Sequence, residues 1–331
     1  MRHAARRFAT ALSLIGAACG GTPDTLAIER ELPLADPSAT MLHVDRFDRI
    51  WLAGPGVIVR IDSAGREAVR HPLRSPAPPR WLASNADRVF FHAGARLTVL
   101  PLEPADPEPA SADSVLEVSQ APAAALALDP LDRFVFRTAE AGAVVAHDAV
   151  TLEPIWGWAA VGGEGSAITL SPLGDSLYEA VAPAAAESHL LVRDVQTGRI
   201  IRRVELPHPV HELRTGPDGS IYAVGWSAES DGSVIRLRWW DGDLTVDWRT
   251  SFGELGLTAP VRASLAPSGR LLAVLGLQHE AGLPVLDTEA GQSVGRLPGA
   301  ALDVGFTRSD RLYVLRTGEL QRLAPLRFGE D

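Results

Sequence analysis

The sequence has no lysine, and all 31 of its basic residues are arginine. Cys19 is its only cysteine and Asn85 its only asparagine. Without lysine the chain has neither a Schiff-base nucleophile nor a phosphate-binding P-loop lysine. Without a second cysteine it forms no intrachain disulfide and no thiolate zinc site. Any chemistry therefore depends on histidine, aspartate, glutamate, serine, tyrosine and arginine.

The charge balance argues against a nucleic-acid partner. The chain has a formal net charge of −10, which becomes −13 once residues 1–18 and their three arginines are removed. Binding to nucleic acid requires clustered positive charge to contact the phosphates. A hydrophobic content of 46% instead supports a globular domain with a well-buried core.

The start of the chain has the layout of an export signal. Three arginines within residues 2–7 precede an uncharged, mostly apolar run over residues 8–18. This run is too short to span a bilayer as a helix, so residues 1–18 are expected to be a signal peptide. An ordinary signal peptidase could cleave after Ala18, which would leave Cys19 unmodified.

The four residues Gly16-Ala17-Ala18-Cys19 resemble the bacterial lipobox, in which the cysteine becomes the lipidated first residue of the mature chain. The resemblance implies a lipidated Cys19 followed by a short tether over residues 19–24. Lipidated bacterial proteins carry more than one acyl chain, which is enough for stable membrane attachment. Gly20 resembles the signal for onward transport, so we expect a lipid anchor in the outer membrane of a bacterial cell envelope.

A pattern of about 44 residues recurs seven times. Each copy has a short apolar strand, a turn ending in Asp or Gly followed by Arg or Ser, and a second apolar strand. The turn triplets are Asp48-Arg49-Ile50, Asp87-Arg88-Val89, Asp132-Arg133-Phe134, Asp175-Ser176-Leu177, Gly219-Ser220-Ile221, Gly269-Arg270-Leu271 and Asp310-Arg311-Leu312.

Most copies continue into a second hairpin, as in "VIVRIDSAGREAV" and "LLVRDVQTGRIIRRV". Four short strands per copy, repeated seven times, predict an all-β fold: a seven-bladed β-propeller of four-stranded blades over residues 25–331. The last copy supplies only three strands, while residues 25–34 form a spare strand at the start. We expect this segment to complete the last blade and close the ring.

The copies "SPLGDSLYEAV" with "VRDVQTGRII", and "GPDGSIYAVGW", resemble the YVTN and quinoprotein-like members of the WD-repeat propeller superfamily. The resemblance covers roughly residues 38 to 327 and implies the fold rather than an activity. A repeating Trp-Asp ending is absent. Quinoprotein cofactor contacts need lysine and asparagine, and lactonase-type propellers bind metal with Glu, Asn and Asp, so the resemblance implies no cofactor.

Alternation along the innermost strands places two sets of residues at one mouth of the central channel. The first set is Met41, Arg80, Ala125, Ile168, Glu212, Arg262 and Asp303. The second set, two residues further on, is His43, Leu82, Ala127, Leu170, Arg214, Ser264 and Gly305.

Two interpretations of these charges remain open. One is a ring of ion pairs, with Arg262 beside Asp303 and Arg80 beside Glu212. The other is a site for a small anion or a peptide terminus, held by Arg80, Arg214 and Arg262, because arginine binds carboxylates through a planar fork. His43 and His211 complete the candidate ligand-binding set, and no residue is assigned a catalytic role because arginine pairing should hold the carboxylates ionised.

Other candidate features favour structural roles. His208 and His211 are three residues apart on a strand and so point to opposite faces, which argues against a metal site. Asp241, Asp243 and Asp247 lack the spacing of a calcium loop and fit a solvated hairpin. The tryptophans at 156, 158, 239 and 240 are expected to pack between blades. Longer loops near residues 185, 229 and 280 could form a docking face or be variable surface loops.

These observations favour a membrane-anchored propeller outside the cytoplasm that binds a protein, peptide or glycan without catalysis. The alternative is a hydrolase or lyase that uses carboxylate or histidine groups at the channel mouth, because the fold hosts both kinds of protein. Neither a cofactor nor a metal is expected.

Overall fold

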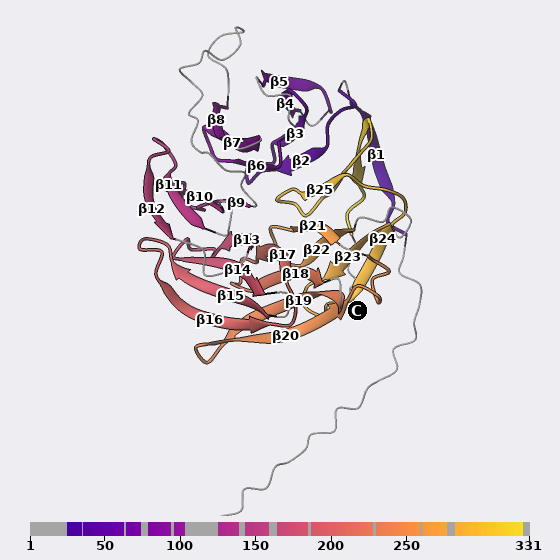
Figure 1. Cartoon of the computed structure of the whole chain (residues 1–331). Helices are drawn as coiled ribbons and strands as arrows, with labels where there is room; N and C mark the ends of the chain where they lie inside the picture. Colours follow the sequence, from indigo (N-terminus) through magenta and orange to yellow (C-terminus); the bar gives the residue numbers. More distant parts are fainter. Residues whose placement is uncertain are drawn as a thin grey trace, which may run out of the picture.

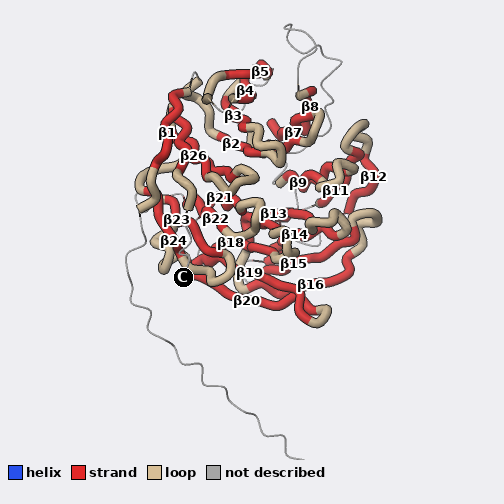
Figure 2. The backbone as a smooth tube through the Cα atoms, turned by 180° about the vertical axis from the view of Figure 1, so that it is seen from behind, coloured by secondary structure: helices blue, strands red, loops and turns tan. Residues whose placement is uncertain are grey.

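A computed structural model describes residues 25–34, 36–62, 64–73, 79–93, 96–102, 125–138, 143–158, 164–184, 187–227, 230–258, 260–276 and 282–326. These residues form seven antiparallel sheets arranged around a central axis (Figure 1). Figure 2 shows the same ring from behind, built from strands and loops without a helix in the described part. The predicted all-β, seven-bladed propeller is confirmed.

Blades 1 to 6 run from their innermost to their outermost strand in chain order, whereas blade 7 has the first strand of the chain at its outer edge. Blade 1 holds β2 (Met41–Val44), β3 (Ile50–Gly54), β4 (Val57–Ile61) and β5 (Glu67–Pro72), and blade 2 holds β6 (Trp81–Ser84), β7 (Arg88–Ala93) and β8 (Arg96–Pro101). Blade 3 holds β9 (Leu126–Leu128), β10 (Phe134–Thr138), β11 (Val144–Asp148) and β12 (Pro154–Trp158), and blade 4 holds β13 (Glu164–Leu170), β14 (Ser176–Ala184), β15 (Glu187–Asp194) and β16 (Ile200–Leu206).

Blade 5 holds β17 (Val210–Thr215), β18 (Ile221–Ser227), β19 (Ser230–Trp240) and β20 (Asp243–Ser251), and blade 6 holds β21 (Pro260–Leu265), β22 (Leu271–Gly276), β23 (Leu283–Asp287) and β24 (Ser293–Leu297). Blade 7 holds β25 (Asp303–Phe306), β26 (Leu312–Arg316), β27 (Glu319–Leu323) and, as its outermost strand, β1 (Ile28–Pro33).

The ring is closed by the first strand of the chain. β1 pairs antiparallel with β27, and Leu32 lies opposite Leu320. Just before β1, the Leu26 amide donates to the Arg296 carbonyl of blade 6 at 2.9 Å. The first and last strands of the described chain therefore lie side by side in blade 7. The closing strand falls within residues 25–34, the segment named from the sequence.

The turn after each innermost strand explains the recurring Asp or Gly. Six of the seven turns place one residue in the left-handed backbone region, where glycine is at ease and aspartate is tolerated. Their φ values lie between 56° and 80°, at Asp48, Asp132, Gly174, Gly219, Gly269 and Asp310. In blade 4 this residue is Gly174 rather than Asp175, because the turn there is longer by one residue than in blade 1.

The same turns carry a second recurring device that the sequence pattern did not reveal. In every blade a short polar side chain accepts a hydrogen bond from a turn amide. These side chains are Asp45, Asn85, Asp129, Ser171, Asp218, Ser268 and Thr307. The single asparagine of the chain is thus one of the seven turn caps.

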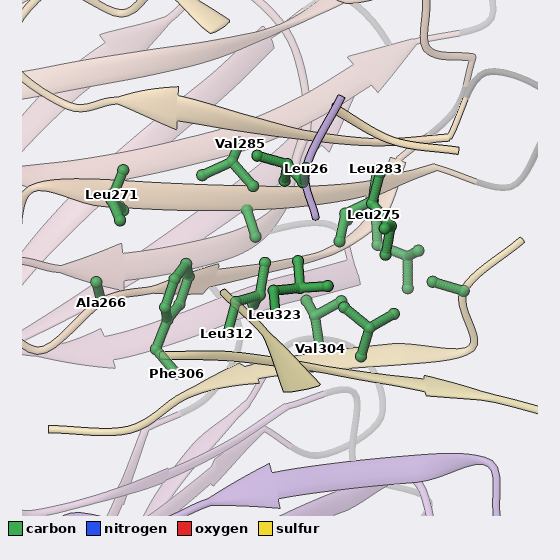
Figure 3. Close-up of a cluster of buried hydrophobic side chains, with 14 residues drawn as sticks. Leu26, Ala266, Leu271, Leu275, Leu283, Val285, Val304, Phe306, Leu312 and Leu323 are labelled. Atoms are coloured by element: carbon green, nitrogen blue, oxygen red, sulfur yellow. The ribbon is translucent and has the colours of Figure 1, made fainter. Parts of the chain in front are cut away.

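Hydrophobic cores lie between neighbouring blades. Between blades 6 and 7, for example, Leu275 and Leu283 pack with Val304, Phe306 and Leu26 (Figure 3). Burying a side chain of this size stabilises the fold by roughly 1.5–3 kcal/mol. The closing segment therefore contributes apolar packing as well as strand pairing.

Arginines also connect the blades. Arg49 donates to the Asn85 carbonyl, and Arg133 donates to the Gly174 carbonyl at 2.6 Å. Arg236 joins blade 5 to the Thr288 carbonyl of blade 6 at 2.9 Å. The guanidinium group suits these links because it presents five donors in a fixed plane. Several of the turn-triplet arginines found in the sequence therefore have a structural role.

The outermost pair of strands contains a register shift in blades 1, 3, 4, 5 and 6. Such bulges bend an edge strand and interrupt its pattern of free backbone groups, which discourages the addition of another strand. No helix among the described residues is long and apolar enough to cross a membrane.

Candidate functional site: the central channel

The innermost strands enclose a cavity of 510 Å³ along the axis of the ring. A volume of this size accommodates a small-molecule ligand or the end of a larger one. All seven residues of the second set named from the sequence line it: His43, Leu82, Ala127, Leu170, Arg214, Ser264 and Gly305. Four residues of the first set do so as well, namely Met41, Ile168, Arg262 and Asp303.

Arg262 and Asp303 form the ion pair expected between blades 6 and 7. Asp303 Oδ2 also accepts the Leu42 amide of blade 1 at 2.8 Å, which ties the first and last blades together at the channel. The second Nη of Arg262 donates to the Arg80 carbonyl at 2.9 Å, and its guanidinium lies 5.5 Å from the centroid of the Trp81 ring.

The expected pair of Arg80 with Glu212 is wrong. Glu212 Oε1 is paired with Arg214 at 2.9 Å within blade 5, while Arg214 Nε donates to the Ala263 carbonyl at 2.8 Å. Arg80 is exposed and lies outside the cavity wall. Residues two positions apart on a strand point to the same face, so Glu212 lies closer to Arg214 than to an arginine several blades away.

Both carboxyl groups are withdrawn from solvent. The side chains of Glu212 and Asp303 are only 4% and 2% exposed. Burial raises the pKa of Glu212 and that of Asp303, and it outweighs the opposing effect of Arg214 and Arg262. Burial therefore opposes the arginines at both groups, and the expected ionised state of these carboxylates stays a prediction.

A second polar cluster crosses from blade 1 to blade 2. His43 Nε2 lies 3.2 Å from Ser84 Oγ, and Ser84 Oγ donates to Asp45 Oδ2 at 3.0 Å. Burial lowers the pKa of His43 to about 4, so the ring is neutral at pH 7. Only His43 of these three was singled out from the sequence, because Ser84 lies on blade 2 and meets His43 and Asp45 of blade 1 only in the folded ring.

This cluster is not a nucleophilic triad. Hydrogen bonds from two backbone amides, the Arg49 side chain and the Trp51 ring hold the pKa of Asp45 below its usual value despite its burial. Ser84 Oγ donates its hydrogen bond to the ionised Asp45 rather than to His43, so this serine is not activated by His43. The cluster instead fixes the hydrogen-bonding pattern of one wall of the cavity.

In the two ion pairs of blades 5 to 7, the guanidinium group is the more exposed partner. The side chains of Arg214 and Arg262 are 37% and 21% exposed, whereas the carboxylates with which they pair are almost fully buried. One oxygen of Glu212, Oε2, has no hydrogen-bond partner. The cavity wall formed by blades 5 to 7 thus presents donors and positive charge to the channel.

The remaining candidates lie away from the cavity wall. His211 is exposed, with Nε2 3.3 Å from the Trp226 carbonyl, and His208 is buried, with Nε2 2.6 Å from Ser233 Oγ. Within the described ranges, no group of three His, Cys, Asp or Glu side chains is placed to hold a metal ion.

The tryptophans expected between blades divide into two groups. Trp156 and Trp158 donate to carbonyl groups of blade 4, at Val195 and Thr197, and Trp239 donates to the Tyr178 hydroxyl. Trp240 is 77% exposed, so its expected packing role is wrong. It flanks a two-residue turn, where the side chain projects beyond the neighbouring blade.

Several features named from the sequence lie outside the described residues. They are Cys19 with residues 1–24, and the central parts of the loops at 185–186, 228–229 and 277–281.

Comparisons with known proteins place the fold. No protein-family model and no curated protein matches the sequence. Among solved structures, the β-propeller domain of Cps50 (Swd1) from Myceliophteria thermophila is similar, with a TM-score of 0.74 at 13% identity, and the match covers 91% of this chain and 100% of that one. The chain is thus a seven-bladed β-propeller with a WD40-type structural neighbour, and this likeness shows the fold alone.

Proposed function

We propose that the protein is a non-enzymatic binding module whose channel receives a carboxylate carried by a protein, peptide or glycan. The observation that carries this proposal is the pair of partly exposed guanidinium groups, Arg214 and Arg262, on the wall of the 510 Å³ cavity. Arginine binds carboxylates through paired N–H donors. The near-complete burial of Glu212 and Asp303 supports an anionic ligand, because the guanidinium group is then the more exposed partner of each ion pair.

Titration calorimetry with two matched probe pairs tests this proposal. The first pair is N-acetyl-trialanine and its C-terminal amide, and the second is trigalacturonate and its methyl ester. We expect the acids to bind and the neutral partners to bind at least about tenfold more weakly, as for the loss of one charged contact. Arg214→Gln should abolish the difference, whereas Arg203→Gln, an exposed arginine on the outer rim, should preserve it.

Failure of both acids to bind at millimolar concentration would contradict the carboxylate site. Equal binding by the wild-type protein and the Arg214→Gln variant would do the same.

We further propose that the module is a YVTN-like propeller attached to a bacterial outer membrane through a lipidated Cys19. The export-like layout of residues 1–18 and the lipobox-like residues 16–19 support this proposal. Cys19→Ser should move the protein from the membrane to the soluble fraction. A variant that stays membrane-bound, together with a wild-type chain that incorporates no labelled fatty acid, would rule out the anchor.

A hydrolase or lyase is the second candidate, and one observation favours it. Asp303 lines the cavity and has a raised pKa, which makes it a better proton donor than an ordinary aspartate. Hydrolysis of the trigalacturonate methyl ester by the wild-type protein, lost in a folded Asp303→Asn variant, would place this candidate first.

A further inference from the structure

The cavity wall of blade 1 presents a hydrogen-bond acceptor, in contrast to the donors of blades 5 and 6. His43 lines the cavity, is partly buried, and contacts Ser84 Oγ through Nε2 at 3.2 Å. Its other ring nitrogen, Nδ1, has no hydrogen bond within the described residues, and it is not among the unpaired side-chain atoms that are closed off from solvent. This nitrogen therefore remains open to a ligand in the cavity.

The neighbours of His43 decide which of its ring nitrogens carries the proton. Ser84 Oγ donates its only proton to Asp45 Oδ2 at 3.0 Å, since hydrogen bonds hold Asp45 in its ionised form. Ser84 Oγ then accepts from His43, so the proton of the neutral ring lies on Nε2. Nδ1 keeps its lone pair and accepts a hydrogen bond, which an ionised carboxylate cannot donate.

This acceptor and the guanidinium groups of the cavity lie near one another. Asp303 Oδ2 accepts the amide of Leu42, the residue before His43, and the same oxygen pairs with Arg262. Burial is the main cause of the lowered pKa of His43, and the positive charges of Arg214 and Arg262 add to it, as expected for groups close enough to interact. One small ligand can therefore contact both the arginines and the histidine.

Hydroxyl groups complete the polar part of the wall. Thr169, Thr215 and Ser264, on the inner strands of blades 4, 5 and 6, all line the cavity. Thr215 donates to Thr169 Oγ1 at 3.2 Å, whereas the Thr169 proton and Ser264 Oγ have no hydrogen-bond partner in the described part of the chain. Each hydroxyl can both donate and accept. Such a wall suits a ligand that carries several hydroxyl groups of its own.

We propose that the ligand of the channel is a sugar acid, whose carboxylate binds Arg214 and Arg262 and whose neighbouring hydroxyl donates to His43 Nδ1. This inference rests on the carboxylate site proposed above and selects sugar acids over protein and peptide termini. A few well-placed polar groups give a ligand pocket its specificity. Here those groups are two guanidinium groups, one neutral acceptor and the hydroxyls of three inner strands.

Other acids match this wall less well. A peptide terminus brings one N–H beside its carboxylate and no hydroxyl, so the hydroxyls of Thr169 and Ser264 stay unmatched. A free amino acid brings an ammonium group next to Arg214 and Arg262, and like charges repel. A simple carboxylate has no donor for His43, and a site built around a hydrogen bond rejects a ligand that leaves its acceptor unpaired.

Two probes that differ in one hydroxyl test the role of His43. Titration calorimetry compares the methyl glycoside of galacturonic acid with its 4-deoxy derivative, which lacks the hydroxyl on the carbon next to the carboxylate-bearing one. We expect the wild-type protein to bind the deoxy probe about tenfold more weakly, as for one lost hydrogen bond to a partly buried acceptor. His43→Phe fills the same space without an acceptor and should bind both probes equally. His211→Phe, at an exposed histidine away from the cavity wall, is the matched control and should keep the difference.

The position of the His43 proton can be measured without a ligand. Nitrogen-15 NMR of the imidazole rings at pH 7, with the His43 signal assigned by its loss in His43→Phe, should show a proton on Nε2 and none on Nδ1. Ser84→Ala removes the oxygen that accepts this proton and should give a mixture of both tautomers. Ser84→Thr keeps the hydroxyl and should restore the Nε2 proton.

The outcomes separate this inference from the proposed function. N-acetyl-trialanine binding more tightly than trigalacturonate, equal binding of the deoxy probe by the wild-type protein, or a proton on Nδ1 would each overturn the sugar acid and leave the carboxylate site standing. Absence of binding by every acid would overturn both. Tighter binding of trigalacturonate than of the single-sugar probe supports the end of an acidic glycan as the source, and equal binding supports a free sugar acid.

Discussion

The two ends of the seven innermost strands follow different rules. Where each strand ends, every blade has the same device, a short polar side chain that accepts an amide of the following turn. Where the strands begin, the equivalent positions differ widely: Met41, Arg80, Ala125, Ile168, Glu212, Arg262 and Asp303. Repetition at one end serves the fold of every blade. Variation at the other end places Glu212, Arg262 and Asp303 on the consecutive blades 5 to 7, which we call the charged sector.

The charged sector has an energetic cost that the turn end avoids. Glu212 and Asp303 are buried, and burial raises the pKa of both. Asp45, at the turn end of blade 1, is also buried, yet hydrogen bonds from Phe47, Arg49 and Trp51 lower its pKa. The buried carboxylates therefore fall into two classes. Hydrogen bonds determine the direction of the pKa shift at Asp45, whereas burial determines it at Glu212 and Asp303.

The largest expected effect comes from removing the best-satisfied cap. Asp45→Ala leaves the Trp51 ring N–H and the Ser84 hydroxyl without their acceptor and leaves Arg49 without its ion pair. We expect a loss of about 3 kcal/mol in the free energy of unfolding, measured by urea denaturation. The control is Asp62→Ala, at an outer turn with two similar amide bonds, which should lose much less stability.

Equal losses in the two variants would show that the cap of the inner turn contributes no more to the free energy of unfolding than the cap of the outer turn.

The turn spacing predicted seven blades because a left-handed backbone position restricts the sequence to a few residue types. The caps were missed because Asp, Asn, Ser and Thr share one function without sharing one letter. The pattern also named eleven of the residues that line the cavity, since alternation along a strand fixes which side chains share a face. It did not identify Arg214 as the partner of Glu212, although both lie on one face of β17, nor Ser84 as a neighbour of His43, which depends on how blades 1 and 2 meet.

The direction of the carboxylate pKa shifts was also beyond the sequence. The sequence places arginines next to Glu212 and Asp303, and that proximity alone favours the ionised forms. Burial acts in the opposite direction, and its extent depends on the finished ring, in which the side chains of both carboxylates are at most 4% exposed.

The second prediction concerns pH. Because the pKa of Glu212 is higher in the folded protein than in the unfolded chain, the folded state binds more protons between these two values, and stability falls as pH rises through that window. Glu212→Gln removes this titration. The variant should therefore gain stability relative to the wild-type protein as pH increases from 4 to 7, measured by thermal unfolding across this range.

Glu205→Gln, at an exposed position on β16, is the control for Glu212→Gln and should show no pH-dependent difference. A stability gain that shrinks with rising pH would mean that Arg214 outweighs burial at Glu212.

The smallest expected effect is at the left-handed position of a turn. Asp310 has a φ of 56°, and its side chain accepts only a long hydrogen bond, 3.3 Å, from the Ser268 amide. Asp310→Gly should change the free energy of unfolding by no more than about 0.5 kcal/mol, since glycine adopts this backbone freely but makes the unfolded chain more flexible. Asp310→Ala should cost about 1 kcal/mol, because alanine has no side chain that eases the left-handed conformation.

The equivalent residue in blade 6, Gly269, sharpens this last test. Its φ is 76°, and a Cβ atom there would lie 2.7 Å from Pro217 Cδ. Gly269→Ala therefore combines backbone strain with a steric clash and should cost more than Asp310→Ala when both are measured by urea denaturation. Equal stability of Asp310→Gly and Asp310→Ala would show that φ does not limit this turn, and the recurring Asp or Gly would then need the inter-blade contacts of its side chain as its explanation.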